Sequence, residues 1–185
     1  MACAALQEVI WGQSFADRVP PSMLLVAQET GGIASGAFDG DRLVGFVFGI
    51  TGVRDGGPVH WSDMLAVHPS HRGRGLGVRL KLHQRERLLE RGVETALWTF
   101  DPLESRNAHL NFRLLGGRSR EYRRDVYGSS DSPLHAGIGT DRLIVEWAMA
   151  SERVRSRLED RGAPEPAAVE GPVLNPPAIA GLPRP

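Results

Sequence analysis

The chain has 185 residues, and its 22 lysines and arginines balance its 22 aspartates and glutamates, so its formal net charge is zero. This balance excludes nonspecific nucleic-acid binding, which requires a surplus of positive charge. The single cysteine, Cys3, excludes an internal disulfide, and no apolar run approaches the roughly 20 residues of a membrane helix. The N-terminus also lacks the basic residues of a signal peptide, so we expect a cytoplasmic protein with no nucleic-acid or membrane partner.

The first part of the chain predicts two helices followed by three strands. The second helix starts after Pro20-Pro21 and ends at Gly31-Gly32. The pair Asp39-Gly40 joins the first two strands as a hairpin. The expected elements are helices 6–12 and 22–30, strands 33–38, 42–50 and 60–67, and a loop over 52–58.

The second part of the chain contains a strand–helix–strand unit. The expected elements are helix 77–91, strand 95–100, helix 105–115, strands 121–127 and 142–149, and a charged helix 151–162. In helix 77–91, Val78, Leu82 and Leu89 share a face, and the middle turn is polar. A crossover of this length joins two parallel strands and is right-handed, whereas the hairpin before it joins two antiparallel strands. We therefore predict an α/β fold with a mixed, mostly antiparallel central sheet, one βαβ crossover and flanking helices.

The C-terminal segment has a different composition from the rest. Residues 163–185 contain seven of the 13 prolines, no aromatic residue and three charged residues. Such a segment can neither form a helix nor bury a core. We predict one domain over residues 1–162 and a proline-rich disordered tail over 163–185.

The loop between strand 60–67 and helix 77–91 has the composition of an anion site. Its sequence is Arg72-Gly73-Arg74-Gly75-Leu76-Gly77. Glycines let a ligand approach the backbone closely, and the free N–H groups and the dipole at a helix start favour an anion. Two arginines add charge beside these amides in a chain with no overall surplus. We predict that this loop binds a diphosphate; the alternative is a flexible loop with exposed arginines.

The glycine spacing narrows the choice of diphosphate. A dinucleotide fingerprint needs Gly-x-Gly-x-x-Gly, but its last position falls on Val78 or Leu80 in the two possible registers. The Gly-Lys-Ser/Thr of a nucleoside triphosphate loop is absent from the sequence. Asp101 could imitate the ribose-binding acid of a dinucleotide enzyme, so that class stays as a weaker alternative.

Two motifs resemble the GNAT superfamily of acyl-CoA-dependent N-acyltransferases. The first is Leu65-Ala66-Val67, His68-Pro69 and Arg72–Gly77, which is similar to the family's strand–loop–helix cofactor motif. The second is Asn107-Ala108 in a helix that ends at Leu115-Gly116. The resemblance covers about residues 24–149. The stretch 98–108 further resembles a branch of predicted acyltransferases, some of which are thought to transfer succinyl or acetyl groups to amino acids.

The resemblance implies acetyl-CoA or another acyl-CoA as co-substrate, bound by residues of both motifs. The backbone amides of Arg72, Gly73, Arg74, Gly75, Leu76, Gly77 and Val78 would hold the pyrophosphate. The backbone of Leu65, Ala66 and Val67 would pair with the pantetheine arm as an added strand does, and Asn107 would hydrogen-bond the cofactor. In such folds strands 60–67 and 95–100 splay apart around the thioester, which an amine attacks directly.

Acyl transfer to an amine requires a base, a polarised carbonyl and a protonated leaving thiolate. A backbone N–H near Leu65 would polarise the carbonyl. Asp63 and Asp101 are the candidate bases, although Asp101 precedes a proline and can simply organise a turn. Where many relatives place a tyrosine acid after Asn107 this chain has Phe112, so Tyr127 or Tyr122 would have to substitute.

These observations lead to an N-acyltransferase that transfers acetyl or succinyl to the amine of a small molecule. The alternative is a non-catalytic acyl-CoA binding or regulatory module, which Phe112 favours. The six histidines lack metal-ligand spacing with cysteine or glutamate, so we expect no metal. We also expect a possible homodimer. Against the pattern of its relatives the chain lacks a first strand before Leu6 and ends early, and we therefore expect it to be truncated.

Overall fold

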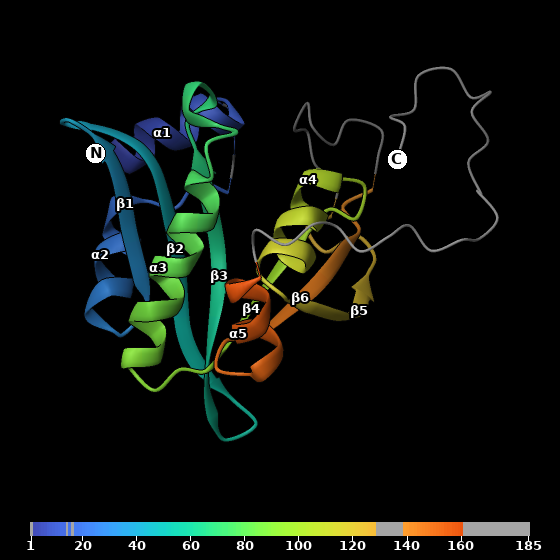
Figure 1. Cartoon of the computed structure of the whole chain (residues 1–185). Helices are drawn as coiled ribbons and strands as arrows, with labels where there is room; N and C mark the ends of the chain where they lie inside the picture. The colour runs from blue at the N-terminus through green and yellow to red at the C-terminus, as the bar shows by residue number, and fades with distance from the viewer. Residues whose placement is uncertain (1, 14, 16, 129–138, 161–185) are drawn as a thin grey trace, which may run out of the picture.

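One six-stranded sheet organises the protein, whose computed structural model describes residues 2–13, 15, 17–128 and 139–160 (Figure 1). The strand order is β1-β2-β3-β4-β6-β5. The pair β3–β4 is parallel and the other four neighbouring pairs are antiparallel. The strands are β1 (Ile33–Asp39), β2 (Arg42–Arg54), β3 (Gly57–Val67), β4 (Thr95–Phe100), β5 (Arg118–Arg123) and β6 (Arg142–Ala148). The predicted α/β class, mixed sheet and single crossover are confirmed.

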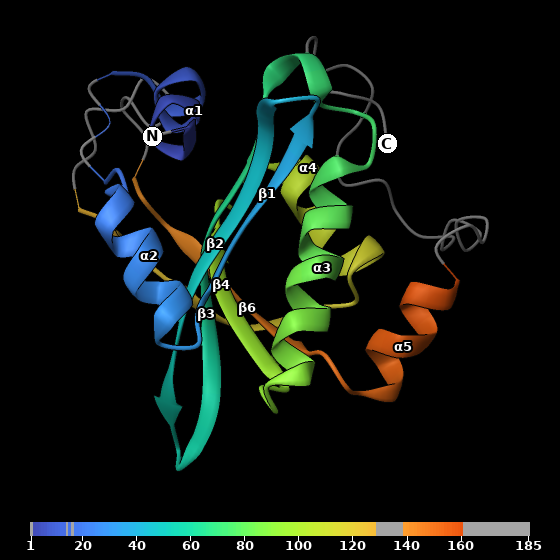
Figure 2. The same cartoon turned by 90° about the vertical axis from the view of Figure 1, so that its left-hand side faces the viewer.

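Helices cover both faces of this sheet, as Figure 2 shows in a view turned by 90°. The N-terminal pair α1 and α2 packs on one face, and α3 packs on the other face over β1, β2 and β3. The helices are α1 (Ala2–Trp11), α2 (Pro21–Glu29), α3 (Leu76–Glu90), α4 (Ser105–Ala108) and α5 (Glu152–Glu159). A short 3-10 turn η1 (Pro69–His71) precedes α3, and a π-helical stretch η2 (His109–Leu114) continues α4. Among the described residues, no helix has the length and apolar character needed to cross a membrane.

The apolar run of β2 is buried because it faces a core on each side of the sheet. Val47 belongs to the core under α3, whereas Phe46 and Phe48 belong to the core under α1 and α2. A strand covered on both faces loses the usual alternation of polar and apolar residues. The continuous apolar sequence Leu43–Phe48 therefore marks the central part of the sheet, as expected from the sequence.

The expected loop over 52–58 is wrong. Strands β2 and β3 continue as a long hairpin in which Val53 pairs with Pro58 and Arg54 with Gly57. The turn consists of Asp55 and Gly56, with φ of 53° and 80°. Two positive φ values at an Asp-Gly pair match the tight turn that fits the right-handed twist of the flanking strands. The glycines and the proline nearby had obscured this signal.

The most buried face of α3 lies beside the apolar face that the sequence shows. The residues that face the sheet are Leu80, Lys81, Gln84 and Leu88, while Val78, Leu82 and Leu89 are only partly buried. Of the polar middle turn 83–87, only Gln84 is buried, while His83 and Glu86 are exposed. Helical periodicity shows which residues share a face but not which face the sheet selects.

Other differences concern the ends of elements. Helix α1 begins at Ala2 rather than at residue 6, and β5 spans Arg118–Arg123 rather than 121–127. Helix α5 ends at Glu159. The predicted domain boundary at residue 162 and the tail over 163–185 lie outside the described residues and stay predictions.

Candidate acyl-CoA site

Strands β3 and β4 part soon after they meet. They pair only through His60 with Ala96 and Trp61 with Leu97. Beyond these pairs β3 stays with β2 up to Val67, and β4 stays with β6 up to Phe100. In Figure 1 the two strands diverge, with α3 beside one and α4 beside the other. This opening separates two halves of the sheet.

A β-bulge marks the point where the strands part. Phe48 on β2 pairs with Met64 on β3, and Ile50 pairs with Trp61. Between these pairs, two residues of β3, Ser62 and Asp63, lie opposite the single residue Gly49 of β2. A side chain at Gly49 would collide with the ring of His60 and the backbone of Trp61. Glycine at this position therefore permits the close approach of the two strands beside the bulge.

Beyond the bulge, one backbone edge of β3 faces the opening. The His68 N–H donates to the carbonyl of Val44 on β2 at 2.8 Å. Because alternate residues of an antiparallel strand bond to the same neighbour, Leu65 and Val67 direct their backbone groups away from β2. The Val67 carbonyl accepts a hydrogen bond from Arg72 Nε at 3.1 Å. The N–H and C=O of Leu65 are thus positioned for an added extended chain.

The predicted phosphate loop lies at the open end of β3. Gly75 is the N-cap of α3 with φ of 72°, and Gly73 has φ of 75°; a Cβ atom at either would meet open space. Arg72 and Arg74 are exposed. Conformations with positive φ are strained for L side chains, so the two glycines let the first amides of α3 face solvent beside the arginines.

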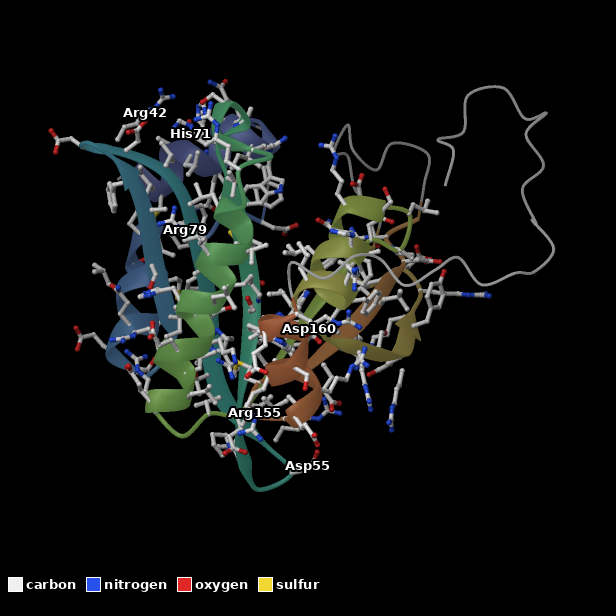
Figure 3. The ribbon with its side chains drawn as sticks, viewed as in Figure 1. Arg42, Asp55, His71, Arg79, Arg155 and Asp160 are labelled. Atoms are coloured by element: carbon white, nitrogen blue, oxygen red, sulfur yellow. The ribbon has the colours of Figure 1, made fainter. Side chains whose placement is uncertain are left out.

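Side chains at the β1–β2 turn support this loop. Arg42 contacts His68 at 2.8 Å, and His71 contacts Asp39 at 3.2 Å. Figure 3 shows Arg42 and His71 at the same end of the sheet. The loop is thereby attached to the hairpin that precedes it.

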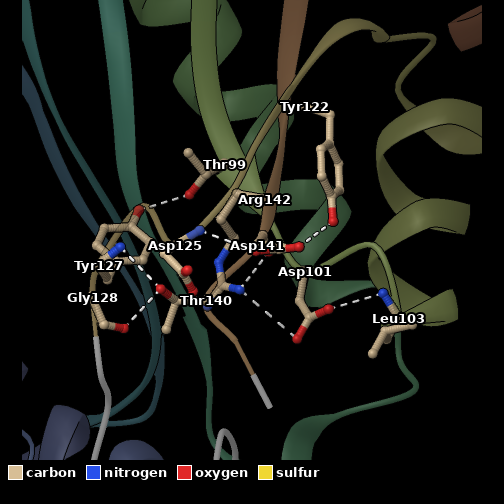
Figure 4. Close-up of polar contacts among 10 residues, drawn as sticks. All are labelled: Thr99, Asp101, Leu103, Tyr122, Asp125, Tyr127, Gly128, Thr140, Asp141 and Arg142. Carbon is tan, nitrogen blue, oxygen red and sulfur yellow. Dashed lines mark hydrogen bonds and ion pairs between the residues drawn. The ribbon is translucent and has the colours of Figure 1, made fainter.

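The opposite wall of the opening comes from β4 and from the segments beside β5 and β6 (Figure 4). The Tyr127 hydroxyl lies 2.7 Å from Thr99 Oγ1, on β4 beyond its last pair with β3. Asp101 Oδ1 accepts from the Leu103 N–H at 2.9 Å, and its Oδ2 is 3.9 Å from Arg142 Nη1. Asp101 therefore organises the turn after β4, which is the structural role that the Asp-Pro sequence indicated as the alternative to catalysis.

The second candidate tyrosine is engaged elsewhere. The Tyr122 hydroxyl donates to the carboxylate of Asp141, and this hydrogen bond raises the pKa of Tyr122. A phenol held by a carboxylate is a poor proton donor to another group. Phe112, which has no hydroxyl to donate, packs edge-on against Phe100 with ring centroids 5.5 Å apart.

Asp63, the candidate base on the bulge, is exposed and not paired in a described ion pair. Although the residue keeps exposed surface, neighbouring protein atoms take water away from its carboxyl and raise its pKa, and the negative charge of Asp17, between α1 and α2, raises this pKa further. A carboxylate with a raised pKa is a stronger proton acceptor. Asp63, on β3, and Asp101, directly after β4, thus have different environments although the two strands are neighbours.

A buried polar cluster lies where β3 and β4 part. Lys81 Nζ donates to Ser62 Oγ on the bulge at 2.9 Å and to Gln84 Oε1 at 2.8 Å. It also lies 3.8 Å from the centroid of the Trp98 ring on β4. Burial lowers the pKa of Lys81 from its usual 10.5 to about 7. One side chain of α3 therefore contacts both splayed strands.

The comparisons with known proteins agree with this geometry. The family model described as Acetyltransferase (GNAT) family matches residues 4–115, more than half of the chain. The chain belongs to the GNAT acetyltransferase family. None of the curated proteins matches the sequence.

Solved structures of other acetyltransferases share the GNAT fold of this chain. Ribosomal-protein-S18-alanine N-acetyltransferase from Escherichia coli is 21% identical, with a TM-score of 0.59 over 82% of this chain and 89% of that chain. The putative acetyltransferase yncA from Salmonella typhimurium, with its cofactor acetyl-CoA, is 18% identical, with a TM-score of 0.58 over 80% and 88%. Naa50 from Arabidopsis thaliana, in complex with a bisubstrate analogue, is 16% identical, with a TM-score of 0.59 over 77% and 87%. At these identities the likeness shows the fold.

The GNAT fold brings most of the predicted site residues around one opening. The phosphate loop, the β3 edge, Asp63 and Tyr127 surround the region where β3 and β4 part. Asn107 lies exposed on α4, and the predicted bond to a cofactor stays a prediction. One turn further on, Asn111 is buried and accepts from Trp98 Nε1 at 3.2 Å, a structural role that sequence reasoning missed.

Sequence reasoning also missed the Lys81 cluster. The helical pattern gives Lys81 no role, because this residue belongs neither to the apolar face of α3 nor to the polar middle turn 83–87. A compositional signal was present, because Lys81 is the only lysine among the 22 basic residues; the other 21 are arginine. Among the described lysine and arginine positions, this lysine is the most buried, and there a side chain with an adjustable pKa differs most from arginine.

Proposed function

We propose that this GNAT protein is an N-acyltransferase that moves an acetyl or succinyl group from coenzyme A to the amine of a small molecule. The observation that carries the proposal is the opening between β3 and β4. From its inner to its outer end it has a bulge, an unshared backbone edge at Leu65 and a glycine–arginine loop. This order matches an acyl-CoA: a thioester, an extended pantetheine arm and a diphosphate.

The reaction we propose is direct attack. The neutral amine nitrogen attacks the thioester carbonyl carbon, the new N–C bond forms, and the C–S bond breaks. The Leu65 N–H donates a hydrogen bond to the carbonyl oxygen as it gains negative charge. The amine loses one proton to a base, and the departing thiolate receives one proton from an acid, so the reaction leaves no net charge on the enzyme once the two groups exchange protons with water.

We assign the base to Asp63 and the acid to Tyr127. Asp63 is exposed at the bulge and has a raised pKa, whereas Asp101 is held in a turn. The Tyr127 hydroxyl contacts Thr99 on the wall of the opening, whereas Tyr122 is bound by a carboxylate. Among the described hydrogen bonds, the side chain that we assign in each pair is the one with no bond to a charged group or a turn amide.

The test separates catalysis from binding. Protein is mixed with acetyl-CoA or succinyl-CoA and a panel of amines and amino acids, and free thiol is followed. Calorimetry with coenzyme A is run in parallel. Amine-dependent thiol release supports the enzyme. Saturable binding without release across the panel favours the non-catalytic module, which the phenylalanine at position 112 also favours. Absence of binding contradicts both.

A further inference from the structure

Lys81 of α3 lies at the point where β3 and β4 part. The last pair of these strands is Trp61 with Leu97, so Ser62 and Trp98 are the first residues beyond the paired region. Lys81 Nζ donates to Ser62 Oγ at 2.9 Å and lies 3.8 Å from the centroid of the Trp98 ring. The ammonium therefore contacts each strand at the first residue that no longer pairs with the other strand.

The β3 side of this contact is the β-bulge, where the sheet itself holds the chain least. Ser62 and Asp63 lie opposite Gly49 alone on β2, and β4 no longer pairs with β3 at this point. A bulge interrupts the regular ladder of backbone hydrogen bonds. The Ser62 hydroxyl, in contrast, accepts from Lys81 and donates to Gln84 Oε1 at 3.0 Å. These two side-chain contacts anchor the bulge to α3.

The β4 side of the contact is fixed by its own neighbours. Trp98 Nε1 donates to Asn111 Oδ1 of η2 at 3.2 Å, and the Trp98 ring packs edge-on against Trp147 of β6 with centroids 5.8 Å apart. Trp147 Nε1 in turn donates to the Leu115 carbonyl at 2.7 Å. A cation over the face of an indole ring is attracted to that ring. Trp98 thus gives the ammonium a fixed partner in the β4 half of the sheet.

A chain of hydrogen bonds orients the polar groups around Lys81. Thr51 on β2 donates its hydroxyl proton to the Gly31 carbonyl at 2.9 Å and so accepts from His60 Nδ1 at 3.0 Å. His60 Nε2 then accepts from the Gln84 amide nitrogen at 3.0 Å, which directs Gln84 Oε1 toward Lys81 at 2.8 Å. The acceptor for the ammonium is therefore fixed by contacts that run from β2 through β3 to α3.

A lysine in this position lowers the stability of the fold. Its side chain is 2% exposed, and among the described residues no carboxylate forms an ion pair with it. A buried ammonium without an anion is costly, and an uncharged side chain of similar volume is usually at least as stable in its place. Side chains that lower stability are expected where activity requires them. The contacts of Lys81 indicate that this requirement is to hold the two strands.

We propose that Lys81 is a positioning residue for acyl transfer, which fixes the distance between β3 and β4 at the inner end of the opening. The inference rests on the proposed function, which places the thioester between these strands and assigns the base to Asp63. The Ser62 hydroxyl points to α3, whereas Asp63 is exposed and lies within reach of the charge of Asp17, between the helices that cover the other face. By holding Ser62, Lys81 fixes the direction in which Asp63 faces the amine.

The first experiment separates catalysis from cofactor binding. Lys81→Met removes the ammonium, and Arg85→Met is its control, because Arg85 donates to the Met149 carbonyl after β6 rather than to β3 or β4. With acetyl-CoA and an amine that the wild type accepts, kcat should fall about 10- to 100-fold in Lys81→Met, because a displacement of about 1 Å at the reacting groups costs this much. The control should keep the wild-type kcat.

Calorimetry with coenzyme A completes this experiment. Both variants should bind coenzyme A like the wild type, because the phosphate loop lies at the outer end of the opening. Unfolding in urea establishes that the variants are folded under the assay conditions. An unchanged kcat in Lys81→Met, or a loss of kcat no larger than the loss of coenzyme A affinity, overturns the proposal.

A double-mutant cycle tests whether the bulge is what Lys81 positions. Ser62→Ala removes the other end of the hydrogen bond and should lower kcat as Lys81→Met does. The combined variant should be no slower than Lys81→Met alone, because both substitutions remove one contact. Additive losses in kcat would show that the two side chains act independently, and the proposal would be wrong.

A third measurement needs neither activity nor a variant. Protein labelled with ¹³C at lysine Cε and with ¹⁵N gives one lysine signal, because the chain has one lysine. Burial lowers the pKa of Lys81 to about 7 and that of His60, beside it on β3, to about 3, so the two titrations are separate. The signals of the Ser62 amide and the Trp98 indole N–H should shift with the same midpoint as the lysine signal.

The outcomes distinguish the two proposals. Signals of Ser62 and Trp98 that do not follow the lysine titration overturn the role of Lys81, whatever the activity. Absence of thiol release from the wild type with every amine contradicts the proposed function instead.

Discussion

Replacing Gly75 by alanine tests the phosphate loop against a matched site on the same helix. Gly75 precedes α3 with φ of 72°, and Gly92 follows α3 with φ of 71°. A Cβ atom at either position meets open space. The two substitutions therefore impose the same backbone strain at opposite ends of one helix, but only Gly75 lies where a diphosphate would contact backbone amides.

The expected magnitudes follow from this match. An alanine forced into the left-handed region costs about 1–2 kcal/mol, which lowers Tm by about 2–4 °C per kcal/mol in a chain of this size. Both variants should lose this amount of stability. At Gly75 the methyl group also separates the phosphate from the amides, and the loss of one hydrogen bond to a charged group, about 1.5–3 kcal/mol, weakens coenzyme A binding about 10- to 100-fold.

The assay is calorimetry with coenzyme A, after thermal unfolding has established that Gly75→Ala and Gly92→Ala lose equal stability. Gly92→Ala should bind coenzyme A like the wild type. If the two variants bind equally well, the diphosphate does not lie at the start of α3. If both bind equally weakly, the loss comes from destabilisation of the helix rather than from the loop.

Four further predictions concern titratable side chains. Asp63→Asn should lower kcat/KM about 100-fold or more, and it should remove the fall in wild-type rate as pH drops through the raised pKa of Asp63. Asp101→Asn can still accept the turn hydrogen bond, so its kcat/KM should stay within a few-fold of wild type. A larger loss in Asp101→Asn than in Asp63→Asn would exchange their roles. Tyr127→Phe should slow thiol release about 100-fold, whereas the control Tyr122→Phe should release thiol like the wild type. If the two variants release thiol at the same rate, neither tyrosine is the acid. Lys81→Met should raise the free energy of unfolding in urea at pH 7 by about 1–4 kcal/mol; a destabilised variant would show that the charge is compensated. Wild-type stability should rise from pH 7 toward pH 10, because the unfolded chain, in which the lysine pKa is about 10.4, keeps its proton where the folded protein, at about 7, loses it.

Local features of the sequence were sufficient for the elements around the phosphate loop. Strand β4 was placed at Thr95–Phe100 without error, and α3 to within one residue at either end. Glycine and proline affect the backbone within a few residues, and arginine is favoured at particular helix positions. The spacing of these residues therefore predicts local structure without knowledge of the fold. The long β2–β3 hairpin was missed for a related reason, because Asp55-Gly56 lay among other turn-forming residues that suggested a wider loop.

The sequence by itself determined the family, the sheet class and the position of the glycine–arginine loop before α3, since these depend on short-range motifs and on hydrophobic period. Only the tertiary structure decided which aspartate faces the opening, which tyrosine is free of a carboxylate, and that Lys81 is buried between two splayed strands. Each of these depends on contacts between segments distant in the chain. Burial and neighbouring charge, which set pKa and hydrogen bonding, arise only when such segments pack together.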